Sequence, residues 1–283
     1  MAPMSSDSAP ALADFLARHP QALVLTGAGL STASGIPDYR GPDGVRRGRA
    51  PIQGPEFRRS TAVQQRYWAR SMVGWATMAQ ARPNPGHVAL AALELGQRIG
   101  SVLTQNVDGL HQRAGSVSVL ELHGNIRTVR CLDCDATFSR AFIQTVMSEA
   151  NPALAALLGP ALAQPAPDGD AHIEPDALEE FHAPFCLHCR GTLTPDVIFF
   201  GDNIPAARTI DAVSRMEAAD ALLVVGSSLM VYSGFRFARM AAASGKPIAA
   251  INFGITRADD LIDLKVEASA EIILPRVAAL LQE

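Results

Sequence analysis

Short apolar runs recur along the chain, and four of them end in small or polar residues. Continuous apolar runs bounded by turn residues are typical of strands buried on both faces of a parallel sheet. We therefore predict strands at residues 22–25, 101–103, 221–225 and 248–251, which lead into Thr26-Gly27-Ala28-Gly29, Thr104-Gln105-Asn106, Gly226-Ser227-Ser228 and Asn252.

Alanine-rich stretches with helical spacing lie between these runs, at residues 87–95 and 235–243. The alternation of strands and helices predicts an α/β fold, a doubly wound, Rossmann-like parallel sheet. In such sheets ligands bind beyond the carboxyl ends of the strands. We therefore expect the four polar strand endings to lie along one edge and to form a ligand site.

Two segments interrupt this alternation. Residues 41–85 are rich in Arg, Gln, Pro and aromatic residues, and residues 127–196 hold all four cysteines. We interpret both segments as parts of a smaller domain inserted into the sheet domain. The sequence thus predicts a discontinuous Rossmann-like domain of residues 1–40, 86–126 and 197–283, and a small domain made of a helical insert, 41–85, and a cysteine-bearing module, 127–196.

Composition narrows the class of protein. The 283 residues are 48% hydrophobic and 18% charged, as is usual for a globular protein. The net charge is −4 and the longest basic cluster is Arg46, Arg47 and Arg49, which disfavours a general nucleic-acid binder because that class needs a basic face. The apolar runs are too short to span a bilayer, and residues 1–20 resemble neither a secretory signal nor a transit peptide. We expect a cytoplasmic protein with no membrane or nucleic-acid partner.

The cysteines form two CxxC pairs, Cys131 with Cys134 and Cys186 with Cys189. Each pair makes a tight turn that directs two thiolates to one point, and two such turns complete the tetrahedral four-sulfur shell that suits zinc. The alternatives are two disulfides, which the lack of a secretory signal disfavours, or a redox motif, which would explain only one pair. A closed shell leaves no position for water, so we predict a structural zinc in a zinc-ribbon module.

A glycine-containing turn, Gly27-Ala28-Gly29, directly follows the first predicted strand. Glycines there let the backbone approach a diphosphate, and a helix expected to begin near Ser31 would favour anionic oxygens. A plain strand-to-helix turn has the same pattern. Thr32 replaces the third glycine of the dehydrogenase fingerprint, and no acidic residue follows about twenty positions later on a second strand. A nucleotide is therefore expected, but a hydride-transferring dehydrogenase is disfavoured.

The stretch GAGLSTASGIPDYR, at residues 27–40, resembles the cofactor-binding loop of the sirtuins. The same order of sirtuin motifs continues with TQNVDGLH at 104–111, ELHG at 121–124, the paired CxxC, VIFFGD at 197–202, GSS at 226–228 and Asn252, so the resemblance covers about residues 23–274. RAPIQ at 49–53, QRYWARSMVGW at 65–75 and the insertion APDGD at 166–170 resemble the class II branch. Tyr39 stands where most of the family has Phe, which is also a flat ring.

This resemblance implies an NAD-dependent deacylase, in which the acyl group of a modified protein lysine moves to ADP-ribose and nicotinamide leaves. It implies that His123, with Asn106, is catalytic and takes a proton from a ribose hydroxyl. Taken alone, such a histidine would more often be structural, although a neutral imidazole with the usual pKa of about 6.5 can accept that proton. His87 and His111 are interpreted as packing or capping residues. The implied cofactor-binding residues are Gly27, Ala28, Gly29, Ser31, Ile36, Pro37, Asp38, Tyr39, Arg40, Gln105, Asn106, Val107, Asp108, Gly226, Ser227, Ser228, Asn252, Phe253, Gly254 and Ala270.

The acylated substrate is expected to bind as an extended strand along residues 230–233 and along Val197, Phe199, Phe200 and Gly201. Tyr67 and Arg70 form a further hypothesis, because they share a helix face at i and i+3 and resemble a Tyr-x-x-Arg pair of sirtuins that remove acidic acyl groups. The alternative is a helix that packs through Tyr67 and Trp68 and leaves Arg70 in solvent.

Two other functions stay open at this point. Protein mono-ADP-ribosyl transfer shares the loss of nicotinamide but has a different acceptor. A non-catalytic zinc-ribbon scaffold or NAD-sensing partner would bind without turnover, and the presence of His123, Asn106 and Asp108 argues against it.

Overall fold

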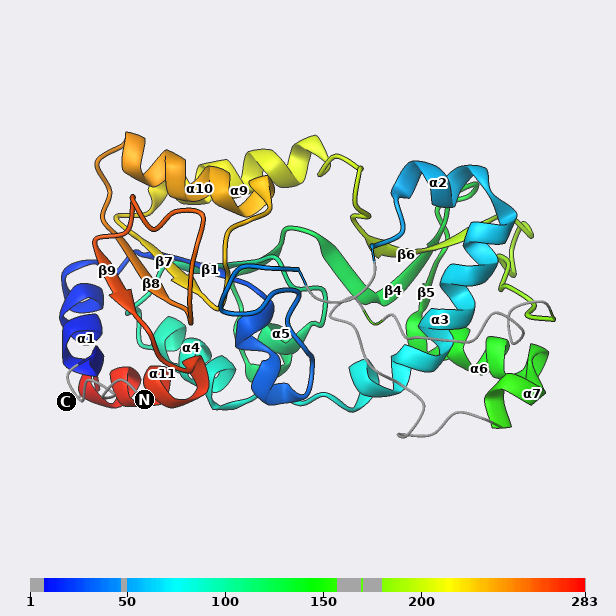
Figure 1. Ribbon diagram of the computed structural model, residues 1–283, viewed down its shortest axis with the longest axis horizontal. Coiled ribbons are helices and arrows are strands. Elements are labelled where there is room, and N and C mark those ends of the chain that lie inside the picture. The colour runs from blue at the N-terminus through cyan, green and yellow to red at the C-terminus, as the bar shows by residue number, and fades with distance from the viewer. Residues whose placement is uncertain (1–7, 47–49, 157–168, 170–179, 283) are drawn as a thin grey trace.

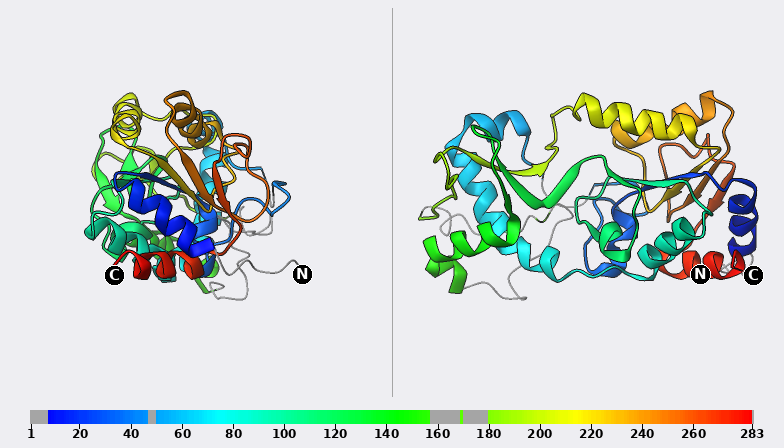
Figure 2. Two further views of the ribbon diagram at one scale, coloured as in Figure 1. Left: turned by 90° about the vertical axis from the view of Figure 1, so that its left-hand side faces the viewer. Right: turned by 180° about the vertical axis from the view of Figure 1, so that it is seen from behind.

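Figure 1 shows the computed structural model of the chain, which describes residues 8–46, 50–156, 169 and 180–282. The molecule is elongated, with one sheet toward each end (Figures 1 and 2). Arg47, Arg49 and the APDGD insertion, except for Gly169, lie outside the described residues. None of the helices in the described part is both long and apolar enough to cross a membrane.

The larger sheet has six strands, all parallel, in the order β3-β2-β1-β7-β8-β9. The four strands expected from the apolar runs are confirmed as β1 (Leu23–Thr26), β2 (Ser101–Thr104), β7 (Leu222–Val225) and β8 (Ile248–Ile251). The edge strands are β3 (Val119–Glu121) and β9 (Leu264–Val266). β9 was not predicted, because an edge strand is only partly buried and its Leu-Lys-Val sequence forms no continuous apolar run.

Helices cover both faces of this sheet, as the doubly wound prediction requires. Alternate strand side chains point to opposite faces, so Val24, Val102 and Leu223 join one core while Leu25 and Val224 join the other. The first core is covered by α1 (Ser8–Arg18), α4 (Pro85–Leu95) and α11 (Ala270–Leu280). The second is covered by α9 (Ala206–Ala218) and α10 (Tyr232–Ala243), which lie above the sheet in Figure 1.

The smaller sheet is antiparallel, in the order β5-β4-β6. Its strands are β4 (Gly124–Cys131), β5 (Thr137–Ser139) and β6 (Leu193–Val197). It packs with α2 (Gly54–Arg59), α3 (Thr61–Gln80), α6 (Arg140–Ala150) and α7 (Pro152–Ala156) around a separate core. The fully buried Trp68 joins α3 to β6, because its indole N–H donates to the Leu193 carbonyl at 3.3 Å.

The helix expected to begin near Ser31 is not formed. The chain instead makes two short 3₁₀ turns, η1 (Ala28–Leu30) and η2 (Thr32–Ser34). Gly35 then adopts a left-handed conformation with φ of 84°, which ends the helical path. Pro37 has no N–H and disfavours helix in the residue before it, so no α-helix can continue. That prediction was wrong, and the carboxyl end of β1 leads into a compact loop.

Two buried histidines, His87 and His111, lie close to this loop. His87 belongs to the capping box of α4, in which Asn84 accepts from the backbone N–H of residue 87 and the Asn84 N–H faces the His87 imidazole at 3.4 Å. His111, on the short helix α5 (Leu110–Ala114), has its Nε2 2.9 Å from the Thr26 hydroxyl. Burial lowers the pKa of His87 to about 4 and, with a smaller contribution from His87, the pKa of His111 to about 3.

These depressed pKa values predict acid sensitivity of the fold. Below pH 6.5 the unfolded chain protonates both imidazoles while the folded chain does not, so the free energy of unfolding should fall by up to about 1.4 kcal/mol per pH unit for each histidine. His111→Gln should therefore make the pH dependence between pH 6 and 4 shallower by about one proton. Urea unfolding followed by tryptophan fluorescence at several pH values measures this slope. An unchanged slope in the variant would show that His111 is not a neutral group of the folded state.

Candidate active site and metal centre

A cavity of about 1310 Å³ opens at the carboxyl edge of the large sheet. It exceeds the roughly 300–1,000 Å³ of a pocket for a drug-sized ligand, so it can hold a dinucleotide with part of a second substrate. All but two of the predicted site residues outside the cysteine centre line it; the exceptions are Pro37 and Arg70. The predicted residues brought together are Gly27, Ala28, Gly29, Ser31, Ile36, Asp38, Tyr39, Arg40, Tyr67, Gln105, Asn106, Val107, Asp108, His123, Val197, Phe199, Phe200, Gly201, Gly226, Ser227, Ser228, Asn252, Phe253, Gly254 and Ala270.

The cavity floor is formed where the loops after β1 and β7 cross. A Cβ on Gly27 would lie 2.7 Å from the Ser227 Cβ, and one on Gly29 would lie 2.9 Å from the Gly226 carbonyl oxygen. Gly226 itself has φ of 60° and contacts Gly29 in turn. The glycines are therefore required first for this backbone crossing. The crossing brings the ends of both strands into one ligand site.

His123 lies between β3 and β4 and is held at both ring nitrogens. Its Nδ1 is 2.9 Å from the Gln105 carbonyl oxygen and its Nε2 is 2.9 Å from the Ser233 hydroxyl. A carbonyl oxygen only accepts, so Nδ1 must carry the proton and the neutral ring presents an unprotonated Nε2. Burial lowers the pKa of His123, as does the Arg208 guanidinium, while the hydrogen bond to Gln105 opposes them. The imidazole is therefore kept neutral and able to accept a proton.

A network of amide, hydroxyl and carboxyl groups lies beside this histidine. The Asn106 amide is 3.1 Å from both the Gly27 carbonyl and the Ser31 hydroxyl, to which it donates. Ser31 donates to one Asp108 oxygen at 2.8 Å, and the Leu110 backbone N–H donates to the other at 2.9 Å. Burial raises the pKa of Asp108, and these two hydrogen bonds oppose it. The network fixes Asn106 and Asp108 against the glycine loop.

Gln105 ties the histidine to the loop after β7. Its carbonyl holds His123, and its side-chain oxygen accepts from the Ser227 hydroxyl at 2.8 Å. Its backbone N–H donates to the Thr26 carbonyl at the end of β1. Gln105, directly after β2, therefore links the carboxyl end of β1, the loop after β7 and His123.

Helix α2 braces the far wall of the cavity, formed by residues 199–202. Arg58 meets the Asp202 carboxylate at two points, at 2.7 and 2.6 Å, and the Gly54 N–H donates to the Phe200 carbonyl at 2.9 Å. Phe57 stacks on Phe199 with ring centroids 4.9 Å apart. The helical insert thus holds one wall of the cavity in place.

Tyr67 and Arg70 differ in their access to the cavity. Tyr67 is buried, packs against Phe57, Trp68 and Phe199, and lines the cavity. Arg70 is half-buried on the same helix and is not among the described residues that line the cavity. Of this pair, Tyr67 therefore lies at the cavity wall, and Arg70 is not among the described residues that line it.

Some lining residues were not predicted. Arg46, Thr209 and Arg236 border the cavity, although no chemical motif marks their side chains in the sequence. Ile52 also borders it, and its place within the class II-like stretch at 49–53 was the available signal. Such residues reach the site through the fold, from loops and from the first turn of α9 and α10.

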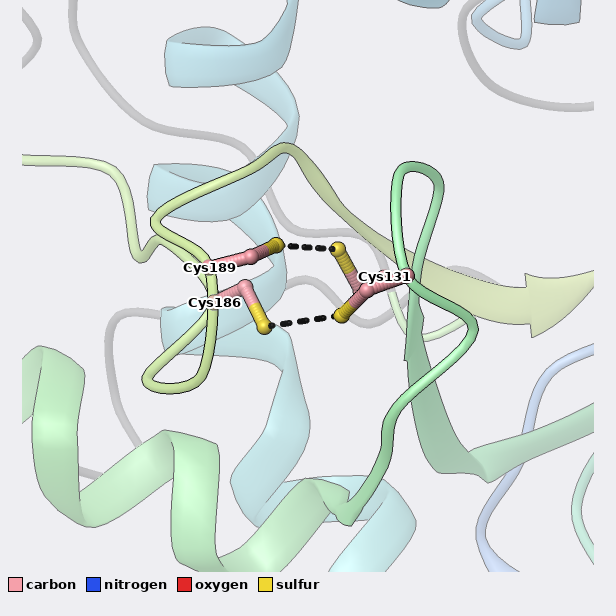
Figure 3. A group of neighbouring side chains, drawn as sticks. Cys131, Cys186 and Cys189 are labelled. Carbon is pink, nitrogen blue, oxygen red and sulfur yellow. Dashed lines mark hydrogen bonds between the residues drawn. The ribbon is translucent and has the colours of Figure 1, made fainter.

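The four cysteines meet at the end of β4 far from His123. Their sulfurs all lie within 4.8 Å of one another, with 3.5 Å between Cys131 and Cys189 and 3.7 Å between Cys134 and Cys186 (Figure 3). None of the four is in a disulfide. A tetrahedral zinc with Zn–S bonds of about 2.3 Å places sulfurs about 3.8 Å apart, so the donor set fits zinc. His123 directly precedes the eight-residue strand β4 and Cys131 is its last residue, and an extended strand of this length spans about 26 Å.

The fold and site define an α/β protein with a nucleotide-sized cavity at the sheet edge and a remote, zinc-fitting four-sulfur centre. A sequence model of the Sir2 family matches residues 27–233. The chain belongs to the Sir2 family.

Relatives and solved structures agree with this membership. An "NAD-dependent protein deacetylase" of Xanthomonas axonopodis pv. citri (strain 306) is 52% identical over 258 residues, 91% of this chain and 87% of the relative. An "NAD-dependent protein deacetylase 2" of Bradyrhizobium diazoefficiens is 49% identical and covers 96% of this chain and 97% of the relative. A solved structure described as "Sir2-p53 peptide-NAD+" is 30% identical, with a TM-score of 0.75, and covers 95% of this chain and 97% of that chain.

The sulfur centre predicts a measurable dependence on zinc. Cys134→Ser removes one of four ligands, so the purified variant should lose its zinc and its midpoint of thermal unfolding should fall by roughly 10 °C, the shift expected for a loss of ~4 kcal/mol in a chain of this size. Metal analysis of the purified protein and differential scanning fluorimetry measure both effects. His188→Ala, an exposed non-ligand position within the second CxxC turn, is the control and should keep one zinc per chain. Full zinc content in Cys134→Ser would contradict the assignment.

Proposed function

We propose that this chain is an NAD-dependent protein-lysine deacetylase, which moves an acyl group from lysine to ADP-ribose and releases nicotinamide. The observation that carries the proposal is the neutral imidazole of His123, whose unprotonated Nε2 lies in the cavity beside Gln105, Asn106 and Asp108. The relatives named as NAD-dependent protein deacetylases at about half identity over most of the chain support it.

NAD would supply the ribose carbon at which the acyl oxygen displaces nicotinamide, and the ribose hydroxyl that finally carries the acyl group. One water would be consumed as the lysine amine is released. His123 would take a proton from a ribose hydroxyl at Nε2. The Gln105 carbonyl accepts from Nδ1–H and so favours the imidazolium that forms. Because the site is partly buried, these hydrogen bonds act in a medium of lower dielectric than water.

The remaining roles follow from the groups along the cavity. Asn106 would orient a ribose hydroxyl or water, and Asp108 would hold the nicotinamide amide. The backbone around Gly27 would approach the diphosphate, with Arg40 nearby and Tyr39 over the ribose. Ser227 and Ser228 belong to the set proposed to hold the adenosine half, together with Gly226, Asn252, Phe253, Gly254 and Ala270.

The acylated lysine would enter between two segments that line the same cavity. Residues 197–201 follow β6, and residues 230–233 lead into α10. Main-chain pairing with both segments would hold an extended peptide while reading few of its side chains. Tyr67 and Phe199 would then contact the acyl end.

The two sheets and their separate cores support the proposed division into a discontinuous Rossmann-like domain, 1–40, 86–126 and 197–283, and a small domain, 41–85 and 127–196. Membership of the class II branch is also proposed, from the motif at 65–75. A cytoplasmic location and the absence of a nucleic-acid partner stay predictions.

The base assignment predicts a selective loss of turnover. His123→Ala should lower the rate of nicotinamide release from NAD and an acetyl-lysine peptide by about 10²- to 10⁴-fold, the usual contribution of a general base. Its affinity for ADP-ribose, measured by calorimetry, should change little, because the described cavity residues of the glycine loop and the β7 loop stay in place. His182→Ala, at an exposed position, is the matched control and should keep full activity. Wild-type rates in His123→Ala would overturn the assignment.

The acyl preference is tested through the helix that carries Tyr67 and Arg70. If Arg70 binds the carboxylate of an acidic acyl group, Arg70→Ala should lower kcat/KM on succinyl- and methylglutaryl-lysine peptides by roughly 10- to 100-fold, as expected for loss of a charge-assisted contact, and leave acetyl-lysine turnover unchanged. Arg66→Ala, one turn earlier and exposed, is the control. Equal loss on all three peptides would assign Arg70 to packing alone.

A further inference from the structure

His123 Nε2, the nitrogen proposed to accept a proton from the ribose hydroxyl, already has a hydrogen-bond partner in the protein. The Ser233 hydroxyl oxygen lies 2.9 Å from His123 Nε2. Ser233 is the second residue of α10, is half-buried and lines the cavity. A residue 110 positions away in the sequence therefore contacts the same ring nitrogen, Nε2, that the proposed reaction uses.

The direction of this hydrogen bond follows from the other side of the ring. Nδ1 faces the Gln105 carbonyl at 2.9 Å and must donate to it, which leaves Nε2 as an acceptor in the neutral ring. The Ser233 hydroxyl therefore donates to Nε2. The hydroxyl makes the same contact, with the same polarity, that an alcohol of a ribose would make before giving up its proton.

Other groups around the ring do not supply this contact. Arg208, from α9, acts on His123 through its charge and disfavours the imidazolium. Glu121 lies two residues earlier at the end of β3, where its carboxylate accepts from the Asn125 amide at 2.7 Å. Within the described part of the chain, the groups hydrogen-bonded to the imidazole of His123 are Gln105 and Ser233.

We propose that Ser233 is a positioning residue for the base: its hydroxyl donates to His123 Nε2 in the free enzyme, holds the neutral ring aimed into the cavity, and gives up this place to the ribose hydroxyl when the nucleotide binds. The second half of the inference rests on the proposed function, because it needs a ribose at His123. The first half concerns the free protein alone.

A hydroxyl that donates to Nε2 stabilises the neutral ring, so its removal should raise the pKa of His123. Loss of one such hydrogen bond corresponds to a shift of about 0.5 to 1 pH unit. Once a ribose hydroxyl donates to Nε2 in place of Ser233, the variant and the wild type should have the same His123 pKa.

The test is a titration of His123 by NMR in protein labelled with ¹⁵N at the histidine rings, with the signal assigned by its absence in His123→Gln. Without ligand, Ser233→Ala should titrate about 0.5 to 1 pH unit above the wild type, and Ser233→Thr, which keeps a hydroxyl, should return to the wild-type value. With saturating ADP-ribose, the difference between Ser233→Ala and the wild type should disappear. Ser244→Ala, the same substitution at the exposed end of α10, is the control and should titrate as the wild type.

Each contrary result is distinct. Equal pKa values without ligand would overturn the hydrogen-bond role of Ser233. A difference that persists with ADP-ribose bound would overturn the exchange of partners. A protein that does not bind ADP-ribose would overturn the proposed function, while the comparison without ligand would still decide the role of Ser233. In active enzyme, the acid limb of the pH profile of kcat/KM should shift to higher pH in Ser233→Ala and stay at the wild-type pH in Ser233→Thr.

Discussion

The site depends on the passage of the chain from one sheet to the other at residues 123 and 124. Gly124 has φ of 83°, and a Cβ at this position would collide with the backbone of Asp196 on β6. The Ile198 N–H donates to the His123 carbonyl at 2.8 Å. Only a glycine lets β4 begin this close to β6. His123 is therefore fixed at the junction of the two sheets, with its ring turned toward the end of β2.

The arrangement of the other site residues follows from the position of His123. Gln105, at the carboxyl edge of the large sheet, binds the ring and the β7 loop together. Burial and the nearby Arg208 keep the imidazole neutral, so the nitrogen facing the cavity is a proton acceptor. The sulfur centre is separated from this nitrogen by the length of β4. We propose that this centre closes the end of the small sheet and takes no part in the chemistry proposed at His123.

Much of this arrangement could be predicted because its signals are local. Continuous apolar runs marked the central strands, and paired CxxC turns marked the metal centre. β9 was not predicted because it is a short edge strand with Lys265 at its middle. The helix predicted after Gly29 does not form because Gly35 and Pro37 redirect the chain. The sequence predicted residues 230–233 only as backbone for a peptide, so the contact of the Ser233 hydroxyl with His123 was not predicted, and neither was Arg46 at the cavity, since only the tertiary fold brings these groups there. That Tyr67 lines the cavity while Arg70 is not among its described lining residues likewise depends on how α3 packs.

In the proposed reaction, a neutral His123 directs the acyl group of a modified lysine onto ADP-ribose. Mass analysis of the products formed from NAD and an acetyl-lysine peptide tests it most directly. We expect nicotinamide, the free lysine peptide and an ADP-ribose heavier by one acetyl group, in equal amounts. An ADP-ribosylated peptide or protein that retains its acetyl group would contradict it and would identify ADP-ribosyl transfer as the reaction.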